Sequence, residues 1–193
     1  MKLVFGLGNP GTNYEGTRHN AGFGALGFLG KKLGIDIVKK RRGALVGDGR
    51  LMGEKILLIM PQTYMNKSGD CLYDFMAYYK AEPKDILVLY DDIDLPLSQV
   101  RIRAWGGAGT HNGMRDILEK LGDGNFARIR IGIDGPQQGD LVDYVLGKPA
   151  GEQAKPFAEG MEKAADAAYI YLTEGLEKAQ QSYNVKGSKG EGE

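Results

Sequence analysis

The chain is poor in the residues that build disulfide frameworks and zinc sites. It holds one cysteine, Cys71, and two histidines among 193 residues. A single cysteine excludes a disulfide framework and favours a reducing compartment, for which we predict the cytoplasm. So few Cys and His side chains also disfavour a zinc site built from them, and we expect no metal ion.

Long hydrophobic runs are missing as well. No stretch approaches the ~20 apolar residues of a membrane-spanning helix, and residues 1–20 lack the apolar core of a signal peptide. The overall composition, 42% hydrophobic and 26% charged, is typical of a globular protein. We expect one domain over residues 1–183 and a flexible tail over residues 184–193.

Neither sign of charge is in excess. The chain has 25 basic and 25 acidic residues, and this balance argues at first against a nucleic-acid partner. The charges are segregated, however: residues 31–50 hold seven basic and two acidic side chains, residues 99–130 hold six and three, and residues 152–193 hold five and eight. Such segregation can create a basic face, although ordinary variation along a solvated surface gives the same pattern.

Short apolar runs alternate with helical patterns. Buried strands are predicted at 2–7, 55–60 and 85–90, half-buried strands at 100–104 and 127–133, and helices at 20–33, from Asn66 or Ser68 to 79, at 113–121 and at 152–183. The last helix is Ala-rich and amphipathic. This alternation predicts an α/β fold, with a twisted, mixed and largely parallel sheet flanked by helices in a single globular domain.

Polar residues gather where the predicted strands end, which is where α/β proteins bind ligands. The first strand is followed by Asn9, Tyr14 and Thr17-Arg-His-Asn20, the second by Gln62-Thr-Tyr-Met-Asn66, and the third by Asp91-Asp-Ile-Asp94. A glycine-rich turn at 106–109 leads into Thr110-His-Asn112. We therefore expect these four loops to meet in space.

This set of side chains suits hydrolysis. A histidine such as His19 can take a proton from water, and a carboxylate such as Asp91 can orient the ring and stabilise the imidazolium. Asparagine amides can orient the water or donate to a developing oxyanion. Structural roles remain open, because Asn66 and Asn112 stand where helix N-caps occur and Asn9 lies in a turn.

Other chemistries fit the sequence less well. Gly6-Leu-Gly-Asn-Pro-Gly11 matches the dinucleotide-binding pattern Gly-x-Gly-x-x-Gly, but Pro10 removes a backbone N–H there and the helix begins well after the motif. No serine lies in Gly-x-Ser-x-Gly, and Cys71 falls inside a predicted helix, which disfavours covalent catalysis. We therefore expect water as the nucleophile and no cofactor.

Taken together, the motifs resemble those of the bacterial peptidyl-tRNA hydrolase family over nearly the whole chain. Each motif is unremarkable by itself, but all of them in one order are specific. The matching stretches are Gly6-Leu-Gly-Asn-Pro-Gly11, Tyr14, Thr17-Arg-His-Asn-Ala-Gly22, Pro61-Gln-Thr-Tyr-Met-Asn-Lys-Ser-Gly69, Asp91-Asp-Ile-Asp-Leu-Pro96, His111-Asn-Gly113, Arg128-Ile-Arg-Ile-Gly132 and Tyr144-Val-Leu-Gly-Lys148.

The resemblance implies an esterase that cleaves the bond between a peptide and the 3′ end of tRNA, and thereby recycles tRNA for translation. It implies His19 as general base, Asp91 as its partner and Asn9 at the scissile ester or the water. Peptidyl-tRNA is the expected partner, and a monomer without metal or cofactor is implied. Substrate contacts are implied for Tyr14, Tyr64, Met65, Asn66, His111 and Asn112, and a grip on the tRNA 5′-phosphate for Arg103 and Arg130, with Arg101 on the same strand face.

The chain departs from the family pattern in three loops. Ser98 and Thr110 stand where glycines are usual, and Asp134-Gly-Pro136 varies a glycine-rich turn. Thr110 is expected to restrict the backbone beside the His-Asn pair that follows it. The runner-up function is a non-catalytic RNA-binding protein on the same fold, and loss of His19 or Asp91 would be its signature.

Overall fold

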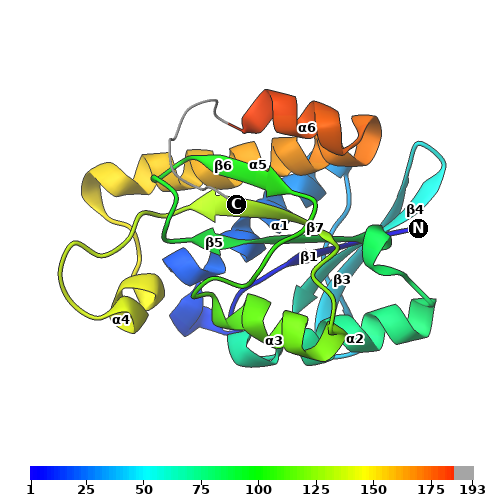
Figure 1. Ribbon diagram of the computed structural model, residues 1–193, viewed down its shortest axis with the longest axis horizontal. Helices are drawn as coiled ribbons and strands as arrows, with labels where there is room; N and C mark the ends of the chain where they lie inside the picture. The colour runs from blue at the N-terminus through cyan, green and yellow to red at the C-terminus, as the bar shows by residue number, and fades with distance from the viewer. Residues whose placement is uncertain (185–193) are drawn as a thin grey trace.

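The computed structural model describes residues 1–184, and a seven-stranded mixed sheet forms the centre of this part of the chain (Figure 1). The sheet order is β2-β3-β4-β1-β5-β7-β6. β4, β1, β5 and β7 run parallel, whereas β2, β3 and β6 pair antiparallel at the edges. The predicted fold class is confirmed. The strands are β1 (Lys2–Gly6), β2 (Lys39–Arg41), β3 (Ala44–Leu51), β4 (Glu54–Pro61), β5 (Ile86–Asp92), β6 (Val100–Arg103) and β7 (Ala127–Gly132).

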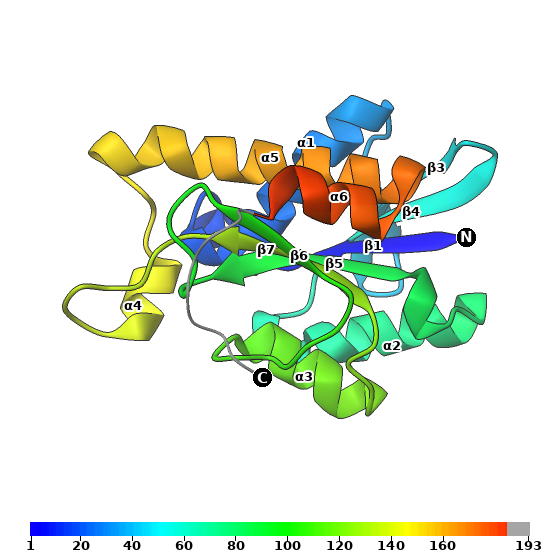
Figure 2. The same ribbon diagram turned by 45° about the horizontal axis from the view of Figure 1, so that its top comes forward.

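Helices cover both faces of the sheet (Figure 2). Alternate residues of β1 point into the two apolar layers, Val4 toward α1 and α5, and Leu3 and Phe5 toward α2 and α3. Burial on both faces explains why the central strands read as continuous apolar runs. No helix in this described region is long and apolar enough to cross a membrane. The helices are α1 (Ala21–Leu33), α2 (Ser68–Tyr79), α3 (Asn112–Leu121), α4 (Leu141–Leu146), α5 (Ala154–Glu174) and α6 (Leu176–Tyr183).

Two regions differ from the sequence-based expectations. The helix predicted over 152–183 is broken at Gly175, whose φ of 93° favours glycine, so α5 and α6 are separate helices. Residues 39–51 form the antiparallel hairpin β2–β3, which the sequence patterns do not reveal. The predicted tail lies outside the described residues except for Asn184, whose amide pairs with the N–H (2.7 Å) and C=O (3.1 Å) of Ile102.

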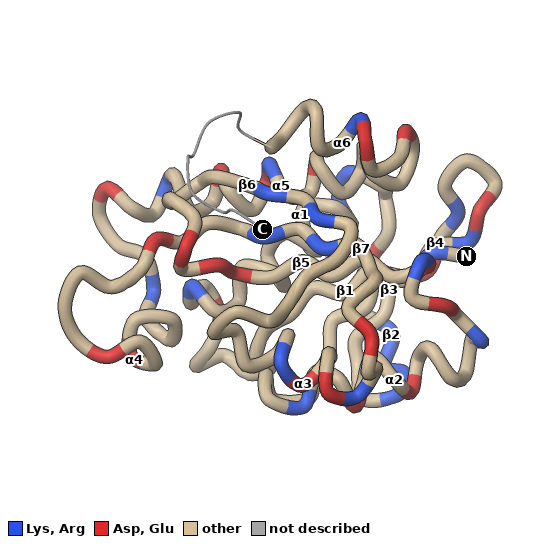
Figure 3. Tube along the Cα trace, viewed as in Figure 1, with Lys and Arg blue, Asp and Glu red and all other residues tan. Residues whose placement is uncertain are grey.

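The basic segments lie at opposite edges of the sheet (Figure 3). Residues 39–42 lie at the β2 edge, and the arginines of β6 and β7 lie at the other. The segregated charges therefore do not merge into one basic face. Only the β6–β7 group borders the ends of the strands that carry the candidate site.

Close packing of α1 on the sheet fixes the residues that precede this helix. A Cβ atom on Gly22 would overlap the carbonyl oxygen of Leu89, and one on Gly6 would overlap that of Gly22. Gly6 of the dinucleotide-like motif thus allows close helix–strand contact. The single turn η2 (Arg18–Asn20), directly before α1, is thereby brought against β5.

Candidate active site

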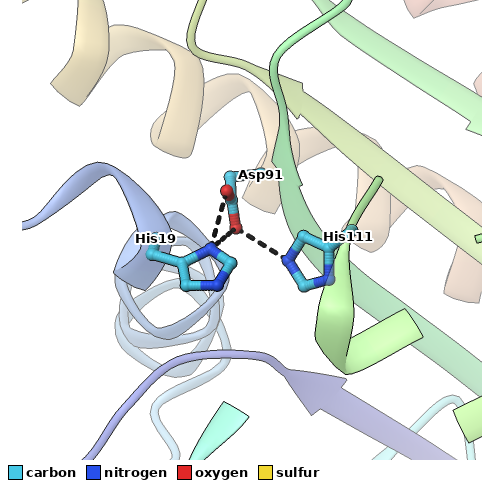
Figure 4. A group of neighbouring side chains, drawn as sticks. All are labelled: His19, Asp91 and His111. Carbon is cyan, nitrogen blue, oxygen red and sulfur yellow. Dashed lines mark hydrogen bonds and ion pairs between the residues drawn. The ribbon is translucent and has the colours of Figure 1, made fainter. Parts of the chain in front are cut away.

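Asp91, near the end of β5, binds two histidines from different loops (Figure 4). Its side chain is 2% exposed. His19 Nδ1 lies 3.0 Å and 2.9 Å from the two carboxylate oxygens, and His111 Nε2 lies 2.9 Å from Oδ1. The two imidazole centroids are 4.9 Å apart. The structure therefore brings together the predicted His19 and Asp91, and it adds His111 to the pair.

The other contacts of each histidine assign its tautomer. The backbone N–H of Met114 donates to His111 Nδ1 over 3.2 Å, so the proton of a neutral His111 lies on Nε2 and is donated to Asp91. His111 is at the same time the N-cap of α3. Because an ionised carboxylate only accepts, His19 directs Nδ1–H at Asp91 and keeps its lone pair on Nε2. His19 is thus the histidine of the pair that can act as a base.

The buried carboxylate stays ionised. Burial raises the pKa of Asp91, but the charges and hydrogen bonds of His111 and His19 outweigh burial and hold this pKa well below its usual range. Burial raises the pKa of the neighbouring Tyr90 to about 12, so its phenol stays neutral. The Tyr90 ring packs edge-on against His111, with centroids 5.0 Å apart. An ionised Asp91 can stabilise positive charge on His19.

The same three side chains form a cluster of the kind that could hold a metal ion, with ligand atoms within 4.8 Å of one another. A metal ion would need a lone pair from each imidazole. In His111 the Nδ1 lone pair accepts the Met114 N–H, and Nε2 carries the proton donated to Asp91. Metal binding would therefore disrupt both of these contacts, and the bonding pattern suits a hydrogen-bonded triad better.

Asn9 is held in place by two neighbouring loops. Asn20 clamps its backbone, accepting from Asn9 N (2.8 Å) and donating to Asn9 O (3.0 Å). The side-chain Oδ1 of Asn9 accepts from the backbone N–H of Met65 (2.7 Å), which leaves its NH₂ group as the donor it can offer a substrate. A Cβ atom on Gly113 would lie 2.6 Å from Met65 Sδ and 3.1 Å from His111 Cε1, so Met65, to which Asn9 is bonded, packs against the first turn of α3 beside His111.

The other predicted substrate residues lie nearer the surface. Tyr14 and Tyr64 pack edge to face with centroids 6.4 Å apart, and Tyr64 is 60% exposed. Asn66 and Asn112 are also exposed. The alternative role as N-caps is wrong for both, because α2 has no side-chain cap and the cap of α3 is His111. Both asparagines thus present their amides at the protein surface.

A cleft of about 830 Å³ opens beside the triad, at the ends of β5 and β7. Asn9 borders a separate hollow of about 360 Å³. The cleft therefore extends from the candidate base to the edge of the sheet that carries the arginines of β6 and β7. It does not include every predicted site residue. Lining the cleft are His19, Asp91, His111, Asn112, Arg103 and Arg130, whereas Tyr14, Tyr64, Met65, Asn66 and Arg101 do not line it.

The predicted phosphate-binding arginines come from the antiparallel pair β6–β7. Arg101 lies opposite Arg130 and Arg103 lies opposite Arg128, which puts all four on one face of the sheet. Arg103 is exposed, whereas Arg130 Nε is bonded to Asp92. The two consecutive aspartates thus have separate tasks, one holding the histidines and the other holding an arginine of the cleft.

Two buried arginines have roles that sequence patterns do not reveal. Arg128 is 1% exposed, although a basic residue of the predicted half-buried strand at 127–133 is expected to face solvent. Arg18 packs over the ring of Tyr144 at 4.2 Å and donates to its carbonyl (3.2 Å) and to Gln153 Oε1 (2.6 Å). Arg18 therefore ties the turn that carries His19 to α4. The motif Thr17-Arg-His-Asn20 includes Arg18, but the sequence does not reveal that Arg18 anchors this turn to α4.

Comparison with known proteins shows the family to which the chain belongs. The model of the peptidyl-tRNA hydrolase family matches residues 3–191. The chain is 46% identical to the peptidyl-tRNA hydrolase of Alkaliphilus oremlandii and 42% identical to that of Halalkalibacterium halodurans, in each case over 95% of this chain and 100% of the relative. The crystal structure of peptidyl-tRNA hydrolase from Acinetobacter baumannii matches with a TM-score of 0.86 at 34% identity, over 94% of this chain and 93% of that one. The chain therefore belongs to the peptidyl-tRNA hydrolase family.

Proposed function

We propose that the protein hydrolyses the ester bond that joins a peptide to the 3′ end of tRNA, and so recycles tRNA for translation. The observation that carries this proposal is the Asp91–His19 pair, in which Nδ1 is bound and Nε2 is left as the base. The pair borders a cleft lined by arginines, which suits an anionic RNA. The family and the named relatives support the same substrate.

In the proposed mechanism, His19 Nε2 removes a proton from water, and the water oxygen attacks the ester carbonyl carbon. Asp91 stabilises the imidazolium that forms, and His111 keeps the carboxylate in place through its Nε2–H. The tetrahedral intermediate then collapses, the ribose oxygen leaves, and the imidazolium returns the proton to it. The NH₂ group of Asn9 donates to the water or to the oxyanion, because its Oδ1 is engaged by Met65.

The peptide is recognised by features that all nascent chains share. The exposed amides of Asn66 and Asn112 are suited to the backbone of a peptide, whose side chains then need not be read. The edge-to-face pair of Tyr14 and Tyr64 supplies an apolar wall for the peptide and the terminal nucleotide. Met65, also predicted to contact the substrate, is 4% exposed and instead positions Asn9 through its backbone N–H. We propose the two asparagines and the two tyrosines as the peptide-binding part of the site.

The enzyme is proposed to act as a monomer in the cytoplasm without a metal ion or organic cofactor. The bonding of His111 supports the absence of a metal from the triad, because both of its nitrogens are engaged. The start of α1 at Ala21 supports the absence of a dinucleotide from the first loop, because a dinucleotide-binding motif opens directly into its helix.

The substrate class is tested with purified protein and two forms of charged tRNA. We expect hydrolysis of N-acetyl-aminoacyl-tRNA to exceed that of free aminoacyl-tRNA by at least about 100-fold in kcat/KM, because only the blocked form offers an uncharged amide to the asparagines. Release of the labelled amino acid is the measurement. RNA binding without any release would instead identify the runner-up, a non-catalytic RNA-binding protein.

The phosphate grip is tested on tRNA with and without its 5′-phosphate. Arg103→Ala is expected to raise KM about 10-fold for the phosphorylated tRNA and to change it little for the dephosphorylated one, because only the first loses a charge-assisted hydrogen bond. Arg103 is a cleaner target than Arg130, whose loss would also remove the guanidinium that pairs with Asp92.

The matched control for this experiment is Arg50→Ala. Arg50 is an exposed arginine of β3 that does not line the cleft, so its removal changes the net charge equally. We expect it to leave both KM values near those of the wild type. An equal loss with both tRNAs in Arg103→Ala would defeat the proposed phosphate contact.

A further inference from the structure

Trp105, the only tryptophan of the chain, is exposed in the same cleft as the candidate base. It follows β6, two residues after Arg103, and it is 70% exposed. None of the roles proposed above uses this side chain. A tryptophan ring in water leaves a large apolar surface uncovered, and tryptophan is enriched among the residues that dominate binding interfaces.

The turn after Trp105 is held by hydrogen bonds from the buried side chain of Arg128. Nη1 of Arg128 donates to the carbonyl oxygens of Gly106 (2.8 Å) and Gly107 (3.2 Å). The guanidinium packs over the ring of Phe126 at 4.2 Å, and the whole residue is 1% exposed. A buried charge bound to backbone carbonyls is costly to displace. The tryptophan is therefore presented on a pre-organised turn, and a ligand that binds it loses little free energy in ordering the protein.

The surroundings of Trp105 indicate the kind of ligand. Arg103 and Arg130 line the same cleft, and Arg103 is the exposed cation beside the aromatic ring, since Arg130 is bonded to Asp92. Proteins bind single-stranded nucleic acid with this combination, because bases stack on the ring and phosphates pair with the cations. An apolar peptide would use the ring but not the arginines, and the middle of a duplex would expose no base face.

We propose that Trp105 stacks on a nucleobase of the single-stranded 3′ end of tRNA and so helps to place the ester at His19. This inference rests on the proposed function, since the ester is attached to the last nucleotide of that strand. The unpaired nucleotides must reach the cleft that holds His19, and Trp105 lines that cleft with its ring uncovered. Tyr90 also lines the cleft but is 4% exposed, so its ring offers no stacking face.

The presence of a single tryptophan allows a direct measurement by fluorescence. Wild-type protein is titrated with deacylated tRNA and with the same tRNA lacking its unpaired 3′ nucleotides, and saturation is followed separately by the anisotropy of labelled tRNA. We expect strong quenching of Trp105 emission by the intact tRNA and little quenching by the truncated one. Unchanged emission at saturation, or equal quenching by both tRNAs, overturns the stacking role.

Kinetics provide the second readout. Trp105→Ala is expected to raise KM for N-acetyl-aminoacyl-tRNA by about 5-fold to 100-fold with little change in kcat, and Trp105→Phe is expected to restore most of the loss. The control is Tyr73→Ala, which removes a 56% exposed aromatic ring of α2 that does not line the cleft. It is expected to leave KM unchanged.

The outcomes separate the stacking role from the proposed function. Hydrolysis by the wild type with an unchanged KM in Trp105→Ala overturns the stacking role alone. Failure of the wild type to hydrolyse the substrate overturns the proposed function. The quenching experiment still tests the stacking role in that case, because it uses deacylated tRNA and requires no hydrolysis. A third outcome is an increase in KM, caused by Trp105→Ala, that depends on the amino acid attached to the tRNA and not on the 3′ nucleotides. That result would show that the ring binds the peptide, and it would overturn the stacking proposal.

Discussion

His19→Ala is expected to lower kcat/KM for N-acetyl-aminoacyl-tRNA by about 10³-fold or more, because general-base catalysis supplies about 10²–10⁴-fold and Asp91, whose pKa lies well below its usual range, is too weak a base to replace it. Asp91 is an ionised acceptor of two hydrogen bonds, and His111 is committed at both nitrogens. The measurement is single-turnover release of the N-acetyl-amino acid, which separates chemistry from product dissociation.

Two controls accompany the His19 variant. Its affinity for deacylated tRNA is expected to stay close to that of the wild type, because the arginines and Trp105 of the cleft are unchanged. The folded state is expected to persist, because Asp91 keeps its bond to His111 and the core clusters do not include His19. Turnover near the wild-type rate in a folded, RNA-binding variant would disprove the assignment of His19 as the base.

The sequence predicts the fold well where one physical signal dominates. Apolar runs that are buried on both faces locate the central strands, and the alternation with helices sets the class of the sheet. The prediction fails where a single backbone angle determines whether a helix continues, as at Gly175 between α5 and α6. Ser98 and Asp134, which stand in positions where the family favours glycine or a glycine-rich turn, adopt positive φ angles of 70° and 57°. Thr110 also stands where the family favours glycine, but it does not have a positive φ angle. Its backbone is therefore not strained in this way beside His111 and Asn112.

The sequence predicts the candidate site only as a set of loops that should meet. That expectation is met for His19 and Asp91, which come from different loops and lie within hydrogen-bond distance. The tautomer of His111 could not be predicted, because it depends on a cap contact that exists only once α3 is formed. The burial of Arg128 could not be predicted either, because the turn that covers it comes from another part of the chain.

Asp91→Asn is expected to lower kcat/KM by about 10²–10⁴-fold while leaving the shape of the site largely intact. An asparagine side chain has one oxygen and one NH₂ group, so it cannot accept N–H bonds from both His19 and His111 through two oxygens. The tautomer of His19 with the proton on Nε2 then becomes competitive, and the imidazolium loses the charge that stabilises it. The matched control is Asp92→Asn, which removes the charge that pairs with Arg130 but leaves the triad in place, and we expect a much smaller loss.

The same substitution is expected to change how stability depends on pH. Because the pKa of Asp91 is lower in the folded state than in the unfolded state, its ionisation stabilises the fold fully above the unfolded value of about 3.9, and this stabilisation is lost as the pH falls toward the folded value. The wild type should therefore lose stability more steeply than Asp91→Asn below about pH 4. Urea midpoints measured from about pH 2 to pH 7 test this. Parallel curves for the two proteins would show that Asp91 is not held ionised by its histidines, and the electrostatic part of the proposed mechanism would then fail with it.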